Sequence, residues 1–228
     1  MNRQNLIVIE GVDGSGKETQ SKKLYQRLLN EGHKVRMISY PCYDKDSSLM
    51  VRRYLAGDFG QNANDISPYI ASTFFAMDRY ASYKDELEEF MNDGGLVIAD
   101  RYTTANMVHQ AGKIQDPVER KKFLDWLWSY EFELLGLPVP KCIIFLDLSP
   151  KENMKLMKNR NNKITGEKQK DIHENDPEHI EQSYKNAVEL AKDYHWNRIQ
   201  CMGEGGLKSI ETIHKEIFDL IQREVMNV

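Results

Sequence analysis

Short apolar runs rich in β-branched residues alternate with longer amphipathic stretches along this chain of 228 residues. This alternation is typical of a parallel sheet whose strands are joined by helices. The runs predict strands at 6–10, 34–39, 95–100, 141–148 and 197–202. The stretches between them predict helices at 17–31, about 47–56, 66–93, 117–135, 150–160, 176–195 and 207–225. The pattern as a whole indicates one doubly wound α/β domain over residues 1–228.

The composition allows such a domain and narrows the range of partners. Hydrophobic residues make up 40% of the chain and charged residues 29%, as in ordinary globular proteins. The net charge of −4 does not favour a nucleic-acid binder, which would carry an excess of lysine and arginine. The first apolar run is interrupted at Glu10, too soon for a signal peptide or a membrane span. We therefore expect neither nucleic acid nor a membrane as a partner.

The cysteines indicate the cellular compartment. Cys42, Cys142 and Cys201 are odd in number, widely spaced and free of any C-x-x-C pair. Such a set favours neither a disulfide framework nor a zinc site, and it suits a reducing environment. We expect a cytoplasmic protein.

The stretch GVDGSGKE at 11–18 has the G-x-x-x-x-G-K spacing of a phosphate-binding loop, and it lies between a predicted strand and a predicted helix. In such a loop the backbone N–H groups and the helix N-terminus face phosphate oxygens, and the lysine reaches the outer phosphates. The alternative is a glycine-rich turn without a ligand. The residues expected to bind a nucleotide such as ATP are Gly11, Val12, Asp13, Gly14, Ser15, Gly16, Lys17, Glu18 and Thr19.

Two residues of this loop depart from the simplest pattern. Glu18 follows the lysine, where a magnesium-binding hydroxyl is expected, and Thr19 is turned about 100° further round the helix. Asp13 places a carboxylate in a loop that wraps a polyphosphate. We expect it to contact a sugar hydroxyl of a second substrate or a magnesium ion. An exposed turn residue is the alternative for Asp13.

A second cluster, VIADRY at 97–102, ends a predicted buried strand. Side chains at the carboxyl end of that strand should emerge beside the phosphate loop. Asp100 would then serve magnesium or its water ligands, and Arg101 would bind a phosphate. A purely structural ion pair between Asp100 and Arg101 is the competing interpretation.

Taken together, these motifs resemble the thymidylate kinase family. The matching pieces, in order along nearly the whole chain, are GVDGSGK, YPCY (40–43), FFAMDRY (74–80), DRYTTANMVHQ (100–110) and the polar segment that ends in DIHE (171–174). The resemblance implies the P-loop NTPase fold, a five-stranded parallel sheet flanked by helices, with a short lid at about 158–176. It implies transfer of the γ-phosphate of ATP to dTMP, with Mg2+ as cofactor, usually in a homodimer.

The resemblance also assigns residues to dTMP. The set is Asp13, Tyr43, Phe75, Arg79, Arg101, Asn106 and His109. Phe75 would stack on thymine and Arg79 would hydrogen-bond the base, and helical spacing puts both on one face. From the residues alone, a core aromatic is the favoured interpretation of Phe75, and a solvated helix charge is the alternative for Arg79.

The remaining members of the set contact other parts of dTMP. Asn106 and His109 would line the base edge and the sugar, Asp13 would meet the 3′-hydroxyl, and Arg101 and Tyr43 would lie at the monophosphate. His109 stands where tyrosine is common in the family, and a capping or surface histidine is its alternative.

The chain also departs from the family. Cys42 stands where many relatives carry arginine, and no basic residue occurs among residues 12–15. We expect the missing charge to come from the lid, which offers Arg160, Lys163, Lys168 and Lys170.

Arg160 is the first choice, so the expected catalytic set is Lys17, Arg101, Arg160 and Asp13, and the expected metal-binding set is Asp100 and Asp13. Two alternatives remain open: another nucleoside monophosphate or nucleoside kinase, and a non-catalytic nucleotide switch. The guanine motif N-K-x-D of a GTPase switch is incomplete in NNKITG (161–166).

Overall fold

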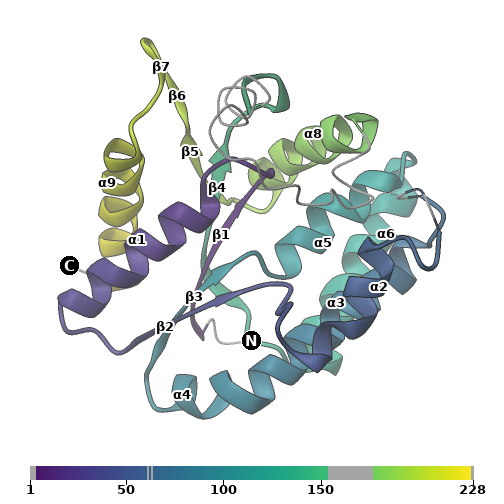
Figure 1. The fold of residues 1–228 in the computed structure, drawn as a ribbon, viewed down its shortest axis with the longest axis horizontal. Helices are drawn as coiled ribbons and strands as arrows, with labels where there is room; N and C mark the ends of the chain where they lie inside the picture. The colour runs from purple at the N-terminus through teal and green to yellow at the C-terminus, as the bar shows by residue number, and fades with distance from the viewer. Residues whose placement is uncertain (1–3, 61, 63, 154–176, 227–228) are drawn as a thin grey trace.

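The structure is a computed structural model, and it describes residues 4–60, 62, 64–153 and 177–226. Five parallel strands form one sheet in the order β2-β3-β1-β4-β5 (Figure 1). Their bounds are β1 Gln4–Gly11, β2 Val35–Ser39, β3 Leu96–Asp100, β4 Pro140–Asp147 and β5 Asn197–Gln200. The predicted fold class is therefore confirmed. The lid predicted at 158–176, with Arg160, Lys163, Lys168 and Lys170, lies outside the described residues.

Helices cover both faces of the sheet (Figure 1). The α-helices are α1 Lys17–Asn30, α2 Leu49–Leu55, α3 Pro68–Ser82, α4 Glu88–Asn92, α5 Thr103–His109, α6 Pro117–Trp128, α8 Pro177–Asp193 and α9 Ile210–Ile221. Short 3-10 turns are η1 Asp46–Ser48 and η3 Ala111–Lys113, and π-helical turns are η2 Tyr83–Leu87, η4 Ser129–Leu134 and η5 Gln222–Met226. None of the helices in these ranges is both long and apolar enough to cross a membrane.

The apolar runs of the strands explain this layering. Alternate residues of a strand point to opposite faces, and a parallel sheet covered on both sides needs apolar residues at every position. In β1, Ile7 and Ile9 pack with α1 and α9 on one face. Leu6 and Val8 pack on the opposite face with η2 and α4. A third cluster joins Phe145 of β4 to α5, α6 and α8.

Several predicted element boundaries were wrong. The helix predicted at 66–93 is α3, η2 and α4 in succession, and the one at 117–135 is α6 followed by η4, so each contains a π-helical turn. The strand predicted at 197–202 ends at Gln200.

The chain then forms a small hairpin, β6 Met202–Gly203 with β7 Gly206–Leu207. Gly206, the first residue of β7 after the turn at Glu204 and Gly205, has a φ of 109°, which a residue with a side chain rarely adopts. Helix α9 therefore begins at Ile210 rather than at 207, with the Ser209 hydroxyl accepting from the Thr212 N–H at 3.0 Å.

The core account predicts different costs for two neighbouring leucines of α1. Leu28 is completely buried in the cluster with β1 and α9, whereas Leu29 is 44% exposed. Leu28→Ala should lower the free energy of unfolding by about 2–5 kcal/mol, because it leaves a cavity. Leu29→Ala is the matched control and should change it by less than about 0.5 kcal/mol. Guanidinium unfolding curves measure both values, and similar losses would contradict this packing.

Candidate active site

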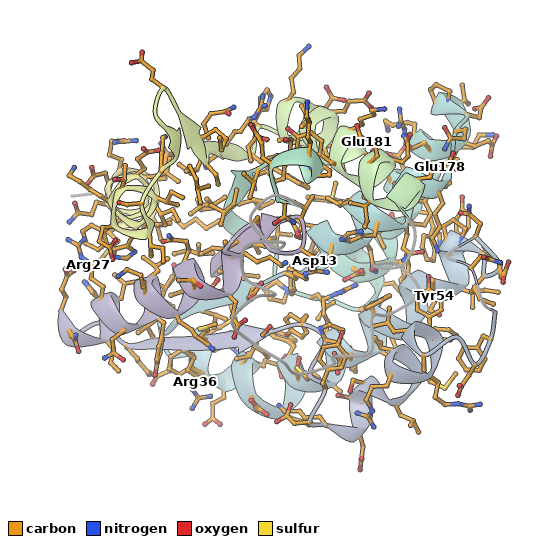
Figure 2. The ribbon with its side chains drawn as sticks, turned by 45° about the horizontal axis from the view of Figure 1, so that its top comes forward. Asp13, Arg27, Arg36, Tyr54, Glu178 and Glu181 are labelled. Carbon is orange, nitrogen blue, oxygen red and sulfur yellow. The ribbon has the colours of Figure 1, made fainter. Side chains whose placement is uncertain are left out.

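The site begins with the register of the parallel strands. Ile9 of β1 lies opposite Asp100 of β3, and Gly11 lies opposite Leu146 of β4. The carboxyl ends of three neighbouring strands therefore meet at one edge of the sheet, which is where ligands bind in open α/β sheets. The loop from β1 to α1, which carries Asp13, leaves the sheet at this edge (Figure 2).

Glycines and one asparagine fix the path of the loop. Gly14 and Gly16 have φ values of 80° and 92°, and Gly16 directly precedes α1. A side chain at Gly14 would collide with the Asn153 carboxamide. The Asn153 Nδ2 group donates to the carbonyl oxygen of Asp13 and so holds the loop against the chain that follows β4.

Asp13 joins two cations in this loop. Its Oδ1 accepts from Lys17 Nζ at 3.1 Å and from Arg101 Nη2. Partial burial alone would raise the pKa of the Asp13 carboxyl, but the charges of Arg101 and Lys17 outweigh burial and hold that pKa well below its usual range. The Asp13 carboxyl is thus ionised at neutral pH. Its side chain is 48% exposed, so solvent also reaches it.

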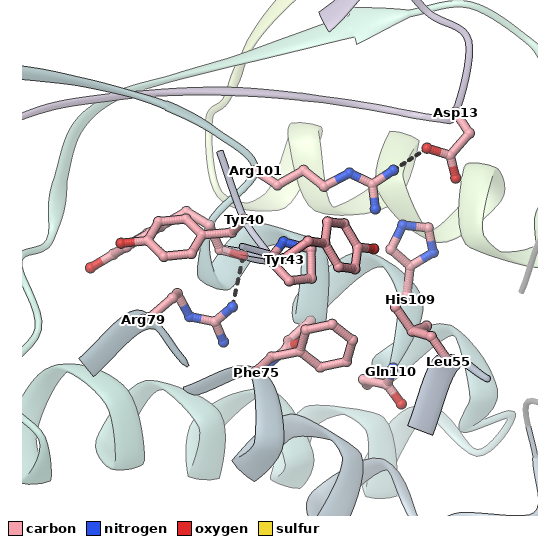
Figure 3. Close-up of a pocket in the computed structure, with 13 residues that line it drawn as sticks. Asp13, Tyr40, Tyr43, Leu55, Phe75, Arg79, Arg101, His109 and Gln110 are labelled. Atoms are coloured by element: carbon pink, nitrogen blue, oxygen red, sulfur yellow. Dashed lines mark hydrogen bonds and ion pairs between the residues drawn. The ribbon is translucent and has the colours of Figure 1, made fainter. Parts of the chain in front are cut away.

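Arg101 reaches Asp13 from an unusual backbone conformation. Its φ is 67°, which is uncommon for a residue with a side chain, and its N–H donates to the Ile9 carbonyl at 3.1 Å. Backbone outliers of this kind gather at functional sites. The conformation turns the Arg101 side chain away from the end of β3 toward the phosphate loop (Figure 3).

Asp100 offers an unused buried acceptor beside the loop. Its side chain is 4% exposed, and its Oδ1 has no hydrogen-bond partner within the ranges that the structure covers. Burial raises the pKa of Asp100, while the charges of Lys17 and Arg101 oppose that rise. Glu18 instead faces solvent, 70% exposed, and accepts from Lys22 Nζ at 2.6 Å.

A pocket of about 530 Å³, its open mouth included, adjoins the Asp13–Arg101 pair. Figure 3 shows His109 next to that pair, with Phe75 and Arg79 on the opposite side. The residues lining it are Asp13, Tyr40, Pro41, Tyr43, Leu55, Phe75, Arg79, Arg101, Tyr102, Ala105, Asn106, His109 and Gln110. All seven residues that the sequence assigned to a second substrate therefore lie around one cavity.

Ring packing and a buried ion pair hold the wall of the pocket that α3 forms. Phe75 is partly buried and packs edge-on against the Tyr54 ring, with 6.1 Å between centroids and an interplanar angle of 88°. Arg79, one turn further on, is 1% exposed, and its Nε and Nη2 donate to Glu131 at 2.8 and 2.6 Å. The solvated helix charge considered for Arg79 is therefore wrong.

Sequence reasoning missed several residues of this site. Glu131 is completely buried and binds Arg79, and Asn153 holds the phosphate loop. Gln110 is 1% exposed and lines the pocket, with its Oε1 unpaired within the described part of the chain. Only Glu131 carries a signal in the sequence, as an acidic residue inside the apolar stretch WLWSYEFELL at 126–135.

A phosphate loop at the carboxyl edge of a five-stranded parallel sheet, with a second-substrate pocket against it, defines the class of P-loop nucleotide kinases. The family model described as thymidylate kinase matches residues 9–217. The chain therefore belongs to the thymidylate kinase family, whose members phosphorylate dTMP to dTDP in an ATP-dependent reaction.

Named relatives agree with this placement. A protein of Pyrococcus horikoshii described as a probable thymidylate kinase is 29% identical, over 99% of this chain and 100% of its own length. Thymidylate kinase of Mycobacterium tuberculosis is 28% identical, over 81% of this chain and 79% of its own. A solved structure of thymidylate kinase from Candida albicans superposes with a TM-score of 0.71 at 22% identity, covering 97% of this chain and 92% of that one, which supports the fold.

Two glycines with similar backbone conformations test the phosphate loop. Gly14→Ala should raise the dissociation constant of ATP at least about 10-fold, because a methyl group there displaces Asn153 and strains the loop. Gly94→Ala is the control, since Gly94 has a φ of 77° but open space around it. Fluorescence titration with an ATP analogue gives both constants. If both variants bound the ATP analogue with the same affinity, Asn153 would not hold the phosphate loop in its binding conformation.

Proposed function

We propose that this chain transfers the γ-phosphoryl group of ATP to dTMP held in the pocket of Figure 3, supplying dTDP for dTTP synthesis. The observation that carries the proposal is the contact between the phosphate loop and the pocket. The Asp13 carboxylate lies at the boundary between them, paired with Lys17 from one side and Arg101 from the other.

On the donor side, the backbone of residues 11–19 surrounds the ATP phosphates and Lys17 reaches the outer ones. Lys17 is 8% exposed, so its charge acts in a poorly solvated place. Enzymes of this type work mainly by positioning the reactants and neutralising charge, because the transition state is loose. We assign that work to Lys17 and Arg101, together with Arg160 from the lid.

On the acceptor side, thymine stacks on Phe75, which the edge-on contact with the Tyr54 ring supports. Arg79 and Asn106 hydrogen-bond the base, and His109 lines the sugar. Asp13 exchanges part of its pairing with Lys17 and Arg101 for the sugar 3′-hydroxyl, and Arg101 and Tyr43 contact the monophosphate. The half-exposed position of Asp13 supports this exchange, since a carboxylate that solvent can reach is also open to a substrate hydroxyl.

Asp100 fits a magnesium ion. Its Oδ1 is buried and unpaired, the charge of Lys17 acts on its carboxyl, and no group of three or more potential metal ligands occurs within the described ranges. Magnesium suits such a place, because it commonly keeps several waters and takes one or two carboxylates together with substrate phosphates. When bound, the ion would offset negative charge on the phosphates. Asp13, already paired with two cations, is the second candidate ligand.

The oligomeric state, the location and the range of partners complete the proposal. The chain forms a homodimer, supported by exposed apolar side chains spaced along α3, namely Ile70, Met77 and Tyr80. It works as a single domain. Its location is the cytoplasm, which is supported by the three cysteines, since all of them are free thiols. Neither nucleic acid nor a membrane is among its partners.

The proposal is tested by ADP production from ATP and magnesium, with and without dTMP. We expect turnover only when dTMP is present, with dTDP formed in equal amount to ADP. ADP release that is independent of dTMP, or the absence of dTDP, would overturn the proposed function.

The magnesium assignment predicts opposite behaviour for two acidic residues. Asp100→Ala should raise the magnesium concentration for half-maximal rate at least about 10-fold, because it removes the carboxylate that anchors the ion's water shell. Glu18→Thr should leave the rate within about 3-fold, since Glu18 faces solvent and pairs only weakly with Lys22. Initial rates of both variants, measured as a function of magnesium concentration, test these two expectations. A dead Glu18→Thr enzyme beside a near-normal Asp100→Ala enzyme would reverse the assignment.

A further inference from the structure

Glu131 is a completely buried carboxylate next to the pocket that does not itself line it. It comes from the π-helical turn η4, at the end of α6, and π-helical turns are frequent at functional sites. Its partners belong to the two elements that carry the proposed base contacts, α3 and α5.

The carboxylate collects hydrogen bonds from four donor atoms. Oε1 accepts from Arg79 Nη2 at 2.6 Å and from Asn106 Nδ2 at 3.5 Å. Oε2 accepts from Arg79 Nε at 2.8 Å and from Thr103 Oγ1 at 2.7 Å. Thr103 is the first residue of α5, so a single side chain fixes both the guanidinium on α3 and the helix that carries Asn106.

These bonds determine which way Asn106 faces. Its Nδ2 also donates to the Ser72 carbonyl at 3.3 Å, so both amide N–H groups are directed at protein acceptors. If the amide were turned over, its Oδ1 would face Glu131 Oε1 and the Ser72 carbonyl oxygen. Three acceptors would then lie together without a donor between them. The group that Asn106 can offer to the pocket is therefore its Oδ1, a hydrogen-bond acceptor.

Arg79 has the complementary character. A guanidinium has five N–H donors and no acceptor. Glu131 takes Nε and one N–H of Nη2, and the Tyr102 carbonyl takes a long bond of 3.4 Å from Nη1. Donors of Arg79 remain for the pocket that it lines. The pair therefore presents a donor at Arg79 and an acceptor at Asn106.

We propose that Glu131 is a positioning residue that sets this polarity, so that the pocket selects a pyrimidine with a 4-keto group and an N3–H over one with a 4-amino group. The inference rests on the proposed function. A 4-keto pyrimidine offers O4 as acceptor and N3–H as donor, which complements the pair, whereas cytosine offers an N4 donor and an N3 acceptor, which is the reverse. A site whose polar groups are left unpaired by the wrong base rejects it strongly.

Glu131→Gln tests the proposal, because it replaces one of the accepting oxygens with an NH2 donor and removes the negative charge. Asn106 is then free to turn its amide, and Arg79 loses its fixed orientation. We expect the ratio of kcat/KM for dTMP to that for dCMP to fall at least about 10-fold, with the KM for ATP changed less than about 2-fold. Glu133→Gln is the matched control, since Glu133 lies in the same turn but is exposed.

A merely structural role for Glu131 gives a different result. Loss of folded enzyme lowers the rates with dTMP and dCMP equally and leaves their ratio unchanged, so an unchanged ratio would overturn the proposal. If Glu131→Gln does not fold, Thr103→Val removes one bond to Oε2 and keeps the ion pair, and the ratio should still fall at least about 3-fold. Wild-type turnover of dTMP tests the proposed function separately. If it is normal while the variants keep the wild-type ratio, only the role of Glu131 is lost.

Discussion

The parallel register between β1 and β3 determines where the functional groups lie. Ile9 is opposite Asp100, and the Ile9 carbonyl accepts from the Arg101 N–H just beyond the end of β3. This alignment places Arg101 beside the phosphate loop that continues β1, and it starts α5 two residues later. Asn106 and His109 on α5 then face the same cavity as Asp13. A shift of one residue in this register would turn each of the side chains of β3 to the other face of the sheet.

Two groups of charges serve the site in different ways. In the pairs of Asp13 with Lys17 and Arg101, the Asp13 carboxylate is 48% exposed, so substrate groups can reach it and compete for its partners. The pair of Arg79 with Glu131 is 1% and 0% exposed. Separating a buried pair costs several kcal/mol, about 3–5 when one partner is removed. The first group can therefore rearrange during a reaction cycle, whereas the second acts as a fixed part of the pocket wall.

This contrast suits a kinase with two substrates. The phosphate side must accept polyphosphates whose charge changes as the phosphoryl group moves, and two cations that share one half-exposed carboxylate can adapt to that change. The base side must distinguish rings that differ by one donor or acceptor, and discrimination of that kind needs polar groups with fixed orientation. In the proposed binding mode, Phe75, in contact with Tyr54, adds a stacking surface that accepts any ring, so the identity of the base would be read by Arg79 and Asn106.

Much of this arrangement follows from the sequence, because local patterns determine it. The apolar runs give the strands, and the spacing of Gly11, Gly16 and Lys17 gives the phosphate loop with its strand and helix. The carboxyl ends of parallel strands lie at one edge of the sheet even when the strands are far apart in the sequence. Asp100 and Arg101 could therefore be placed beside the loop.

The rest depends on tertiary contacts that no local pattern contains. The side chains of Glu131 and Arg79 are separated by 52 positions and pair because a π-helical turn ends α6. Asn153 reaches Asp13 across 140 positions. Helix α5 has only seven residues, too few for periodicity to reveal it.

In the proposed binding mode, one pocket at this edge of the sheet reads the base with a donor from Arg79 and an acceptor from Asn106, both fixed by Glu131. A crystal structure of the complex with dTMP tests this mode most directly. We expect thymine stacked on Phe75, O4 within hydrogen-bonding distance of Arg79, N3 within hydrogen-bonding distance of Asn106 Oδ1, and Glu131 still paired with Arg79. A base bound elsewhere, or an Arg79 that leaves Glu131 to reach the ligand, would contradict it.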